Sequence, residues 1–265
     1  MNKDKTKEVV KESYGKIARG EQTGCGCSCG CNSDFAESLW YSKDELKAIP
    51  SEANLGLGCG NPIIFAQIKK GDCVLDLGSG AGMDAFLAAS KVGTEGKVIG
   101  IDMTPDMIAK ACENAIKNNI ANVEFRLGEI EHMPVEDNLI DVVISNCVIN
   151  LSTDKQKVFQ EIYRVLKSNG KIAISDIALL KPLPQKIQKS MEAYVGCISG
   201  AILVEEYKNL VTNSGLTDVK VVIKGSSSCI KPDTKDPIGK AMLDGLEKNE
   251  SLKDYVVSVY LEARK

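Results

Sequence analysis

The stretch VLDLGSGAGMD at residues 74–84 decides the fold, because an apolar run there breaks into a turn that carries three glycines. The apolar run is typical of a buried strand, and the residues after the turn have the composition of a helix. The next apolar run, KVIGID at 97–102, ends on Asp102, about 20 residues after Gly80, where strand–turn–helix units place an acid that binds ribose hydroxyls. The sequence therefore predicts a site for a ribose-containing cofactor.

Expected strands and helices alternate along the chain between residues 63 and 178. Beyond the two strands above, we expect strands at 122–129, 137–146 and 171–178, and helices at 63–71, 83–93, 104–119 and 153–170. Strands that alternate with helices in this way form parallel βαβ units. We therefore predict an α/β fold with a doubly wound, mostly parallel, Rossmann-like sheet and helices on both faces.

The pattern changes after residue 180. Helical patterns at 185–195 and 204–215 are followed by strand patterns at 218–225 and 255–264, with a further helix between these two strands. No crossover helix there repeats the earlier rhythm, so we expect a small C-terminal α+β extension with at least one antiparallel edge strand on the same sheet. The chain then divides into three parts: a helix and a Cys-rich segment within 1–50, the cofactor-binding domain at 51–180, and a cap region at 181–265.

Composition excludes several classes of protein. The 265 residues are 43% hydrophobic and 26% charged, which is ordinary for a globular chain, and the net charge of −3 gives no reason to expect nucleic acid as a partner. No apolar run approaches the roughly 20 residues that span a bilayer, and the charged N-terminus lacks the apolar core of a signal peptide. We therefore expect a cytoplasmic protein without a membrane partner, and a monomer.

The glycine turn itself indicates which cofactor binds. Its glycines, Gly78, Gly80 and Gly82, do not have the G-x-G-x-x-G spacing of a dinucleotide site, and Asp76 precedes them by two residues. A carboxylate at that point would repel a diphosphate, but it could hold a cationic amino group. S-adenosylmethionine has an ammonium, a sulfonium and a ribose, and it has no phosphate. A plain strand–helix turn without a ligand and a nicotinamide site remain the alternatives.

The whole run resembles the first motif of class I S-adenosylmethionine-dependent methyltransferases, and the resemblance covers about residues 60–180. It implies a cofactor site at the carboxyl ends of the strands, where ligands bind in open α/β sheets. The residues expected to contact the cofactor are Asp76, Gly78, Ser79, Gly80, Gly82, Asp102, Met103, Gly128, Glu129, Ile130 and Asn146.

Ten cysteines are the unusual feature of the composition. Without a secretion signal they should be mostly reduced, and reduced thiols often bind soft metals or do redox chemistry. Three of them stand in loop-like contexts: Cys59 in LGLGCGNP, Cys147 in SNCVINL and Cys197 in GCISGA. They are too far apart in sequence for a zinc cassette, which keeps its ligands in close pairs. Three thiols that converge from separate loops fit this pattern, while buried structural cysteines are the alternative.

These three cysteine motifs, taken together with VLDLGSGAG, resemble those of arsenite methyltransferases over nearly the whole chain. The resemblance implies that Cys59, Cys147 and Cys197 bind trivalent arsenic, which arrives as a thiol adduct, and present it to S-adenosylmethionine. It also implies detoxification by formation of mono- and dimethylated arsenicals, with glutathione or thioredoxin as the thiol reductant. Some relatives carry an acid where this chain has Gly196.

The other cysteines have less defined roles. The segment CGCSCGC contains Cys25, Cys27, Cys29 and Cys31, and it could capture arsenic, exchange thiols, bind zinc or be a dispensable tail. Cys229, in a polar loop, could shuttle electrons or be an ordinary loop residue. We expect Cys73 and Cys112 to be structural, and the single histidine, His132, to lie in a loop near the cofactor without acting as a catalyst.

Two rival functions remain. A methyltransferase of a small carbon or oxygen acceptor, such as a quinone precursor or a lipid, would keep its activity after Cys147→Ser or Cys197→Ser. A metalloid or zinc carrier would bind arsenite through the same thiols without turnover, and Asp102→Ala would leave its binding unchanged.

Overall fold

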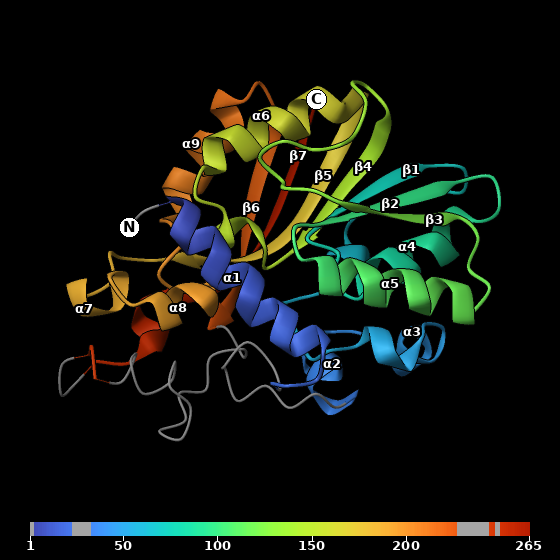
Figure 1. The fold of residues 1–265 in the computed structure, drawn as a ribbon. Coiled ribbons are helices and arrows are strands. Elements are labelled where there is room, and N and C mark those ends of the chain that lie inside the picture. Colours follow the sequence, from blue (N-terminus) through green and yellow to red (C-terminus); the bar gives the residue numbers. More distant parts are fainter. Residues whose placement is uncertain (1–2, 23–32, 227–243, 247–249) are drawn as a thin grey trace.

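The computed structural model describes residues 3–22, 33–226, 244–246 and 250–265. Its centre is a seven-stranded sheet with the strand order β3-β2-β1-β4-β5-β7-β6 (Figure 1). The strands are β1 (Cys73–Leu77), β2 (Lys97–Asp102), β3 (Val123–Leu127), β4 (Ile140–Asn146), β5 (Leu166–Leu179), β6 (Thr217–Ser226) and β7 (Val256–Arg264). The predicted Rossmann-like α/β fold is confirmed, and all seven expected strands are present.

Helices cover both faces of the sheet. They are α1 (Lys3–Ala18), α2 (Ser33–Ser38), α3 (Lys43–Lys47), α4 (Met83–Val92), α5 (Pro105–Lys117), α6 (Lys155–Val165), α7 (Gln185–Gln188), α8 (Met191–Val195) and α9 (Val204–Asn213). Short 3₁₀ helices lie at Ser51–Ala53, Pro62–Ile64, Ile149–Leu151 and Leu252–Asp254. In the described part of the chain, no helix is long and apolar enough to cross a membrane.

The sheet is parallel from β3 through β5. Helices α4, α5 and α6 form the crossovers from β1 to β2, from β2 to β3 and from β4 to β5, and a connection without a helix leads from β3 to β4. Strand β1 pairs with β2 on one side and with β4 on the other, so the turns that follow β1 and β4 lie next to each other. The side chains of β1 are buried almost throughout, as expected for a central strand covered on both faces. Two core clusters, one on each face of the sheet, hold these strands against the helices.

The antiparallel strand is placed differently from the expectation. Strand β7 runs antiparallel to both of its neighbours, β5 and β6, and it lies between them, so the edge is formed by β6. Both C-terminal strands belong to the same sheet as β1–β5. The division of the chain into three parts stays a prediction, and the helix expected between 225 and 255 falls largely outside the described residues.

Three predicted helices were wrong in extent. The segment 63–71 has only the 3₁₀ helix at Pro62–Ile64, because Gln67 adopts a left-handed φ of 47° and turns the chain toward β1. Helix α6 ends at Val165, five residues early, because Leu166 already pairs with Ile140 of β4. The helix expected at 185–195 is divided into α7 and α8.

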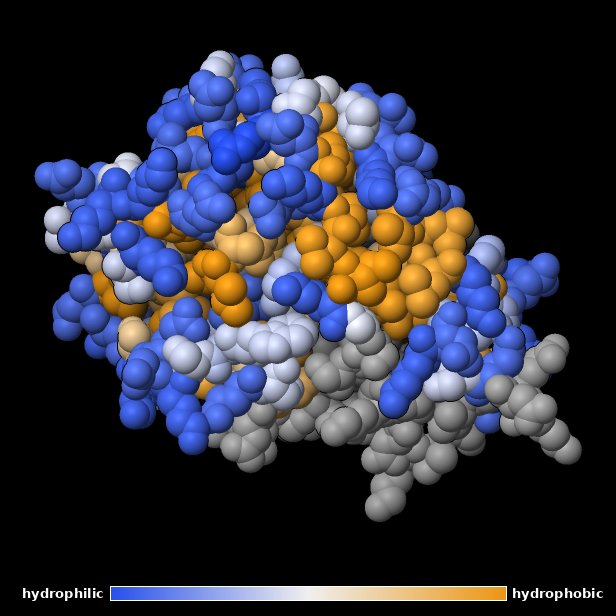
Figure 2. Space-filling model, turned by 180° about the vertical axis from the view of Figure 1, so that it is seen from behind, coloured by the Kyte–Doolittle hydropathy of each residue, from blue (hydrophilic) through white to orange (hydrophobic). Residues whose placement is uncertain are grey.

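The segment before β1 packs against β7 on one face of the sheet. The ring of Phe65 stacks on Tyr260 of β7, with ring centroids 4.3 Å apart, and Trp40 meets the same ring edge-on. Seen from behind, hydrophobic side chains form a broad surface area with a hydrophilic border (Figure 2). The stretch that leads into β1 is therefore anchored on β7, far from it in sequence, and its path brings Cys59 to the carboxyl ends of the strands.

Candidate active site

A deep cleft lies at the carboxyl ends of the central strands. Its empty volume, which includes open solvent at its mouth, is about 1340 Å³. The turns after β1, β2 and β4 form its floor, and α1 contributes Lys7, Val10 and Tyr14 to its wall. The cleft occupies the place where open α/β sheets bind ligands.

The glycine turn shapes one end of this cleft. Gly78 has a φ of 66°, and a Cβ there would stand 2.4 Å from the side chain of Val148, so only glycine lets the turns after β1 and β4 touch. The backbone N–H of Gly80 donates to the Asp102 carboxylate over 3.0 Å, and Thr104 N–H donates to the same carboxylate over 2.8 Å. Asp102 therefore fixes the turn and also faces the cleft.

Asp76 is the strongest sign of a cationic ligand. Its side chain is only 2% exposed and lines the cleft, yet one carboxylate oxygen has no hydrogen-bond partner among the described residues. Burial, with the charges of Asp84 and Asp102, raises the pKa of Asp76 well above its usual value. A buried carboxylate without a partner is unfavourable until a cation reaches it. The site therefore fits the ammonium group of S-adenosylmethionine.

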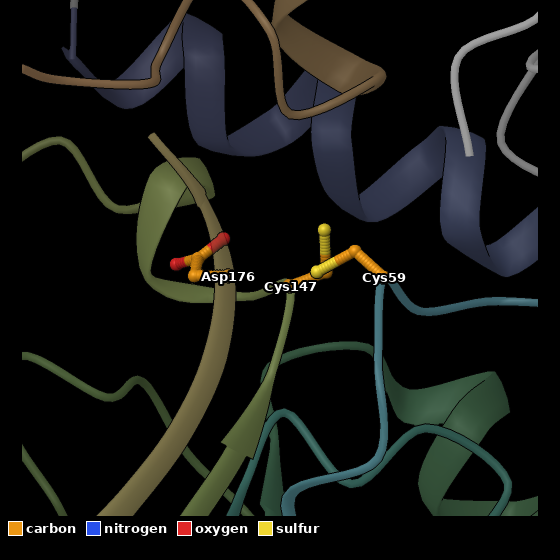
Figure 3. Close-up of side chains that lie close together, drawn as sticks. All are labelled: Cys59, Cys147 and Asp176. Carbon is orange, nitrogen blue, oxygen red and sulfur yellow. The ribbon is translucent and has the colours of Figure 1, made fainter. Parts of the chain in front are cut away.

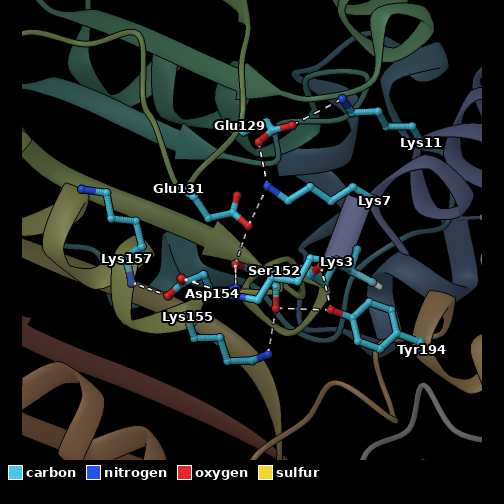
Figure 4. Close-up of polar contacts among 11 residues, drawn as sticks. Lys3, Lys7, Lys11, Glu129, Glu131, Ser152, Asp154, Lys155, Lys157 and Tyr194 are labelled. Carbon is cyan, nitrogen blue, oxygen red and sulfur yellow. Dashed lines mark hydrogen bonds and ion pairs between the residues drawn. The ribbon is translucent and has the colours of Figure 1, made fainter. Parts of the chain in front are cut away.

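Helix α1 is held over the cleft by ion pairs (Figure 4). The Lys7 ammonium lies 2.7 Å from the Glu129 carboxylate and 3.3 Å from that of Glu131, which also accepts a hydrogen bond from Ser152. These pairs hold the pKa of Glu129 below its usual value, mainly through the hydrogen bond from Lys7. Glu129 thus faces α1, while the buried Glu131 lines the cleft.

Thiols gather at the other end of the cleft. The sulfurs of Cys59 and Cys147 and a carboxylate oxygen of Asp176 lie within 4.8 Å of one another (Figure 3). The Cys197 thiol donates to the backbone oxygen of Cys147 over 3.0 Å, and it also interacts with the Cys147 thiol. Three loops that are far apart in sequence therefore bring these three thiols together.

The backbone at two of the thiols is strained. Cys147 and Cys197 have φ values of 60° and 63°, in the left-handed region that residues with a Cβ adopt rarely. Such strain persists where the surroundings impose it, often at functional sites. Both cysteines line the cleft, whereas Cys59 is buried just behind it.

A buried hydrogen-bond network positions Cys59. The Asn146 amide nitrogen faces three acceptors, the Gly60 carbonyl at 2.7 Å, the Tyr41 hydroxyl at 3.0 Å and the Asp84 carboxylate at 3.1 Å. Its amide oxygen is left to accept from the Cys59 N–H, over 3.0 Å. Asn146 therefore ties the Cys59 loop to the end of β4.

Close packing completes this attachment. A Cβ on Gly60 would lie 2.2 Å from the Ser175 hydroxyl of β5, and a Cβ on Gly58 would lie 2.9 Å from the Asn146 amide. The glycines beside Cys59 thus let the loop press against β4 and β5.

The surroundings of the thiols raise the pKa values of Cys147 and Asp176. Contact with the Cys197 thiol favours the Cys147 thiolate, but the Cys59 thiol, burial and the nearby Asp176 charge outweigh it and raise the pKa of Cys147 well above its usual value. Burial raises the pKa of Asp176 to about 6, against the opposing hydrogen bond from Tyr207. Burial thus raises the pKa of both groups and opposes a charge on either.

Most of the predicted site residues do meet in this cleft. Those that line it are Asp76, Gly78, Ser79, Gly80, Asp102, Met103, Gly128, Ile130, Asn146, Cys147 and Cys197. Three others do not: Cys59 lies behind Cys147, Glu129 faces α1, and Gly82 caps α4, where Phe86 and Phe125 leave no room for a Cβ. Cys25, Cys27, Cys29, Cys31 and Cys229 lie outside the described residues. The contacts proposed for each residue with the cofactor or arsenic stay predictions.

Sequence reasoning missed Tyr41, Asp84, Glu131 and Asp176. Asp176 lies within β5, one residue after the last pair of β5 with β4, and so had a recognisable signal, a polar residue level with the carboxyl end of β4. Tyr41 had none, because its contacts with Asp84 and Asn146 depend on how the N-terminal segment packs.

Comparisons with known proteins agree with this geometry. A family profile described as a methyltransferase domain matches residues 68–215. An arsenite methyltransferase of Halobacterium salinarum is 42% identical over 99% of this chain and 67% of its own length. Another, of Aquipseudomonas alcaligenes, is 32% identical over 91% of this chain and 73% of its own length. The crystal structure of an arsenic(III) S-adenosylmethionine methyltransferase from Chlamydomonas reinhardtii superposes with a TM-score of 0.61 at 29% identity, covering 87% of this chain and 73% of that one.

Proposed function

This chain belongs to the arsenite methyltransferase family of S-adenosylmethionine-dependent enzymes, and on that premise we propose that Cys59, Cys147 and Cys197 together hold trivalent arsenic as the methyl acceptor. The observation that carries the proposal is the contact between the two turns. The Val148 side chain, next to Cys147, fills the space over Gly78. The thiol cluster therefore adjoins the turn proposed to hold the cofactor.

Loading of arsenic is a thiol exchange. Arsenite arrives as an adduct with glutathione or another small thiol, and each protein thiol displaces one of these ligands. The proton of each cysteine thiol passes to the departing thiolate, so the raised pKa of Cys147 is compatible with binding. Three sulfurs then hold arsenic as a pyramid and leave its lone pair free.

The cofactor supplies a methyl group on a cationic sulfonium. The arsenic lone pair forms the new As–C bond, and the electron pair of the broken C–S bond stays on the sulfur. No proton moves in this step, so the protein needs to position the two reactants and needs no general base. The single histidine, His132, fits this reaction without a catalytic role.

Methylation formally oxidises arsenic, and further methylation needs two electrons. We propose that cysteine thiols supply them by forming a disulfide, which glutathione or thioredoxin then reduces. Mono- and dimethylated arsenicals would be the products, with detoxification as the outcome. The segment with Cys25, Cys27, Cys29 and Cys31 is proposed to capture arsenic, and the protein to act as a cytoplasmic monomer.

The test is direct chemical analysis of the products. The protein is incubated with S-adenosylmethionine, glutathione and arsenite, and arsenic species are separated by chromatography with elemental mass detection. We expect methylated arsenic from the wild type and from Cys112→Ser, a control on α5, and none from Cys147→Ser with cofactor binding intact. Full activity in Cys147→Ser would contradict the thiol site, and no methylated arsenic from the wild type would favour a carbon or oxygen acceptor.

A further inference from the structure

The reaction above leaves one buried charge next to the thiols without a role. Asp176, at the end of β5, is 0% exposed, and its carboxylate lies within 4.8 Å of the Cys59 and Cys147 sulfurs. In Figure 3 the carboxylate stands on one side of the two sulfurs, on a strand of its own. Burying a carboxylate without a counter-charge is costly, so its presence here calls for a reason.

The surroundings hold this carboxylate in place. One oxygen accepts from the Tyr207 hydroxyl over 2.6 Å, and the other accepts from the Asn150 amide over 2.9 Å and from the Ile177 N–H over 2.8 Å. Among the described residues, no lysine or arginine forms an ion pair with it. The charge of Lys155 acts on it, but the Lys155 ammonium donates to backbone oxygens of Asn150 and Ser152.

Methyl transfer moves a positive charge into this neighbourhood. Trivalent arsenic with three thiolates is neutral, whereas the cofactor carries its positive charge on the sulfonium. When the As–C bond forms and the C–S bond breaks, the charge leaves the sulfur and appears on arsenic. Asp176 lies close to the thiols and on β5, two strands away from β1 and its glycine turn. A fixed anion placed in this way favours that shift, because it interacts more strongly with the product charge than with the reactant charge.

We propose that the Asp176 carboxylate stabilises the positive charge that methyl transfer places on arsenic. This inference rests on the proposed function, since it takes the three thiols as the arsenic site. Tyr207 and Asn150 are then positioning residues, which keep the carboxylate beside the thiols in a pocket with little water.

The test compares Asp176→Asn with the wild type in a single turnover of enzyme already loaded with arsenite. Asparagine keeps the size of the side chain and can still meet Tyr207 and Asn150, so the fold should persist. We expect the rate of methyl transfer to fall by about 100-fold or more, the loss typical of removing one preorganised electrostatic group. The affinity for arsenite, measured by equilibrium dialysis, should change by less than about threefold.

Two further variants separate charge from structure. Tyr207→Phe keeps the charge and removes one hydrogen bond, so its rate should fall by about tenfold at most. Asp176→Glu keeps the charge in a shifted position and should recover part of the rate lost in Asp176→Asn. A wild-type rate in Asp176→Asn, or a loss of arsenite binding that accounts for the whole loss of rate, would overturn the inference. Failure of the wild type to methylate arsenite would instead overturn the proposed function.

Discussion

The glycine turn takes Asp76, Gly78 and Gly80 from one short stretch of chain, whereas the thiol cluster collects Cys59, Cys147 and Cys197 from three separate loops. The two regions also use glycine differently. A Cβ on Gly80 would meet only the Met107 sulfur at 3.9 Å and so faces open space, but a Cβ on Gly60 would clash with Ser175. In the first region Gly80 leaves room for a ligand, although Gly78 also lets the turn meet Val148, and in the second region Gly60 lets the Cys59 loop approach Ser175 of β5.

Because of this difference, we expect a substitution at one end of the cleft to weaken ligand binding at that end alone. The cofactor end depends on local backbone conformation and on one unpaired buried carboxylate. The thiol end depends on contacts between segments that are far apart in sequence, above all those of Asn146 with the Cys59 loop. Substitutions at one end should therefore leave binding at the other end nearly unchanged.

The largest effect is expected from Gly60→Ala. Its Cβ would force the Cys59 loop away from β5, and the three thiols would no longer meet. We expect arsenite affinity to fall by at least about 100-fold, with cofactor affinity within about threefold of wild type, both measured by calorimetry. Gly71→Ala, before β1, strains the backbone at a φ of 85° but meets no neighbouring atom, and it is the control that should bind arsenite normally. Equal loss of both ligands would show that the two ends do not fail independently.

Asp76→Asn should have the opposite pattern. Removing the carboxylate proposed to face the cofactor's ammonium would remove a charge-assisted hydrogen bond of roughly 2–3 kcal/mol, so cofactor affinity should fall about 30- to 100-fold. Arsenite affinity should stay the same. Unchanged cofactor binding in this variant would exclude Asp76 as the ammonium partner.

The same substitution should stabilise the protein without ligands. Burial raises the pKa of Asp76. The stability that the protonated Asp76 side chain contributes is therefore fully present below the pKa of an unfolded aspartate, about 4, and is lost as pH rises through the raised value. The advantage of Asp76→Asn in chemical denaturation should therefore grow as pH increases from 4 to 7. An advantage that shrinks with pH would mean that the carboxylate has a cationic partner in the free protein.

A smaller effect is expected from Tyr41→Phe. The change removes the 2.6 Å hydrogen bond to Asp84 and the one from Asn146, without touching the cleft wall. These hydrogen bonds help to hold the Cys59 loop in position, and losing about 1 kcal/mol of that stabilisation should weaken arsenite binding by about fivefold. If cofactor binding weakens more than arsenite binding, the network serves the glycine turn and not the Cys59 loop.

The smallest effect is expected from Glu129→Gln. Its half-exposed ion pairs with Lys7 and Lys11 are worth less than about 1 kcal/mol, so cofactor affinity should change by less than about threefold. A tenfold or larger loss of cofactor affinity, again measured by calorimetry, would support the prediction that Glu129 contacts the cofactor directly.

The same contrast explains how much could be predicted from the sequence. Strand β2 has the predicted bounds and the glycine turn has the predicted position, because strand periodicity and turn residues are local signals. The resemblance identifies the set of three cysteines. Their convergence rests on long-range contacts, because Cys147 follows β4 while Cys59 and Cys197 reach it through hydrogen bonds to Asn146 and to the Cys147 carbonyl. The role of Tyr41 depends on tertiary contacts, which no local pattern indicates.

Two of the wrong helix predictions, at 63–71 and 153–170, have related physical causes. The apolar spacing of IIFAQIKKG suits a helix, yet Ile64 is 56% exposed, and Lys171 of β5 donates to the Gln67 carbonyl of an irregular segment. At the end of α6, Leu166 is a good helix former, but the chain becomes extended there to pair with β4. In both places a contact with the sheet prevails over local helix preference.

The central claim is that one site of three thiols holds arsenic. It is tested most directly by X-ray absorption at the arsenic edge, on the full chain with Cys25, Cys27, Cys29 and Cys31 replaced by serine and one equivalent of arsenite bound. The account predicts three sulfur neighbours around arsenic, and fewer when Cys59, Cys147 or Cys197 is also replaced. Three sulfur neighbours seen only while the four N-terminal cysteines are present would contradict it.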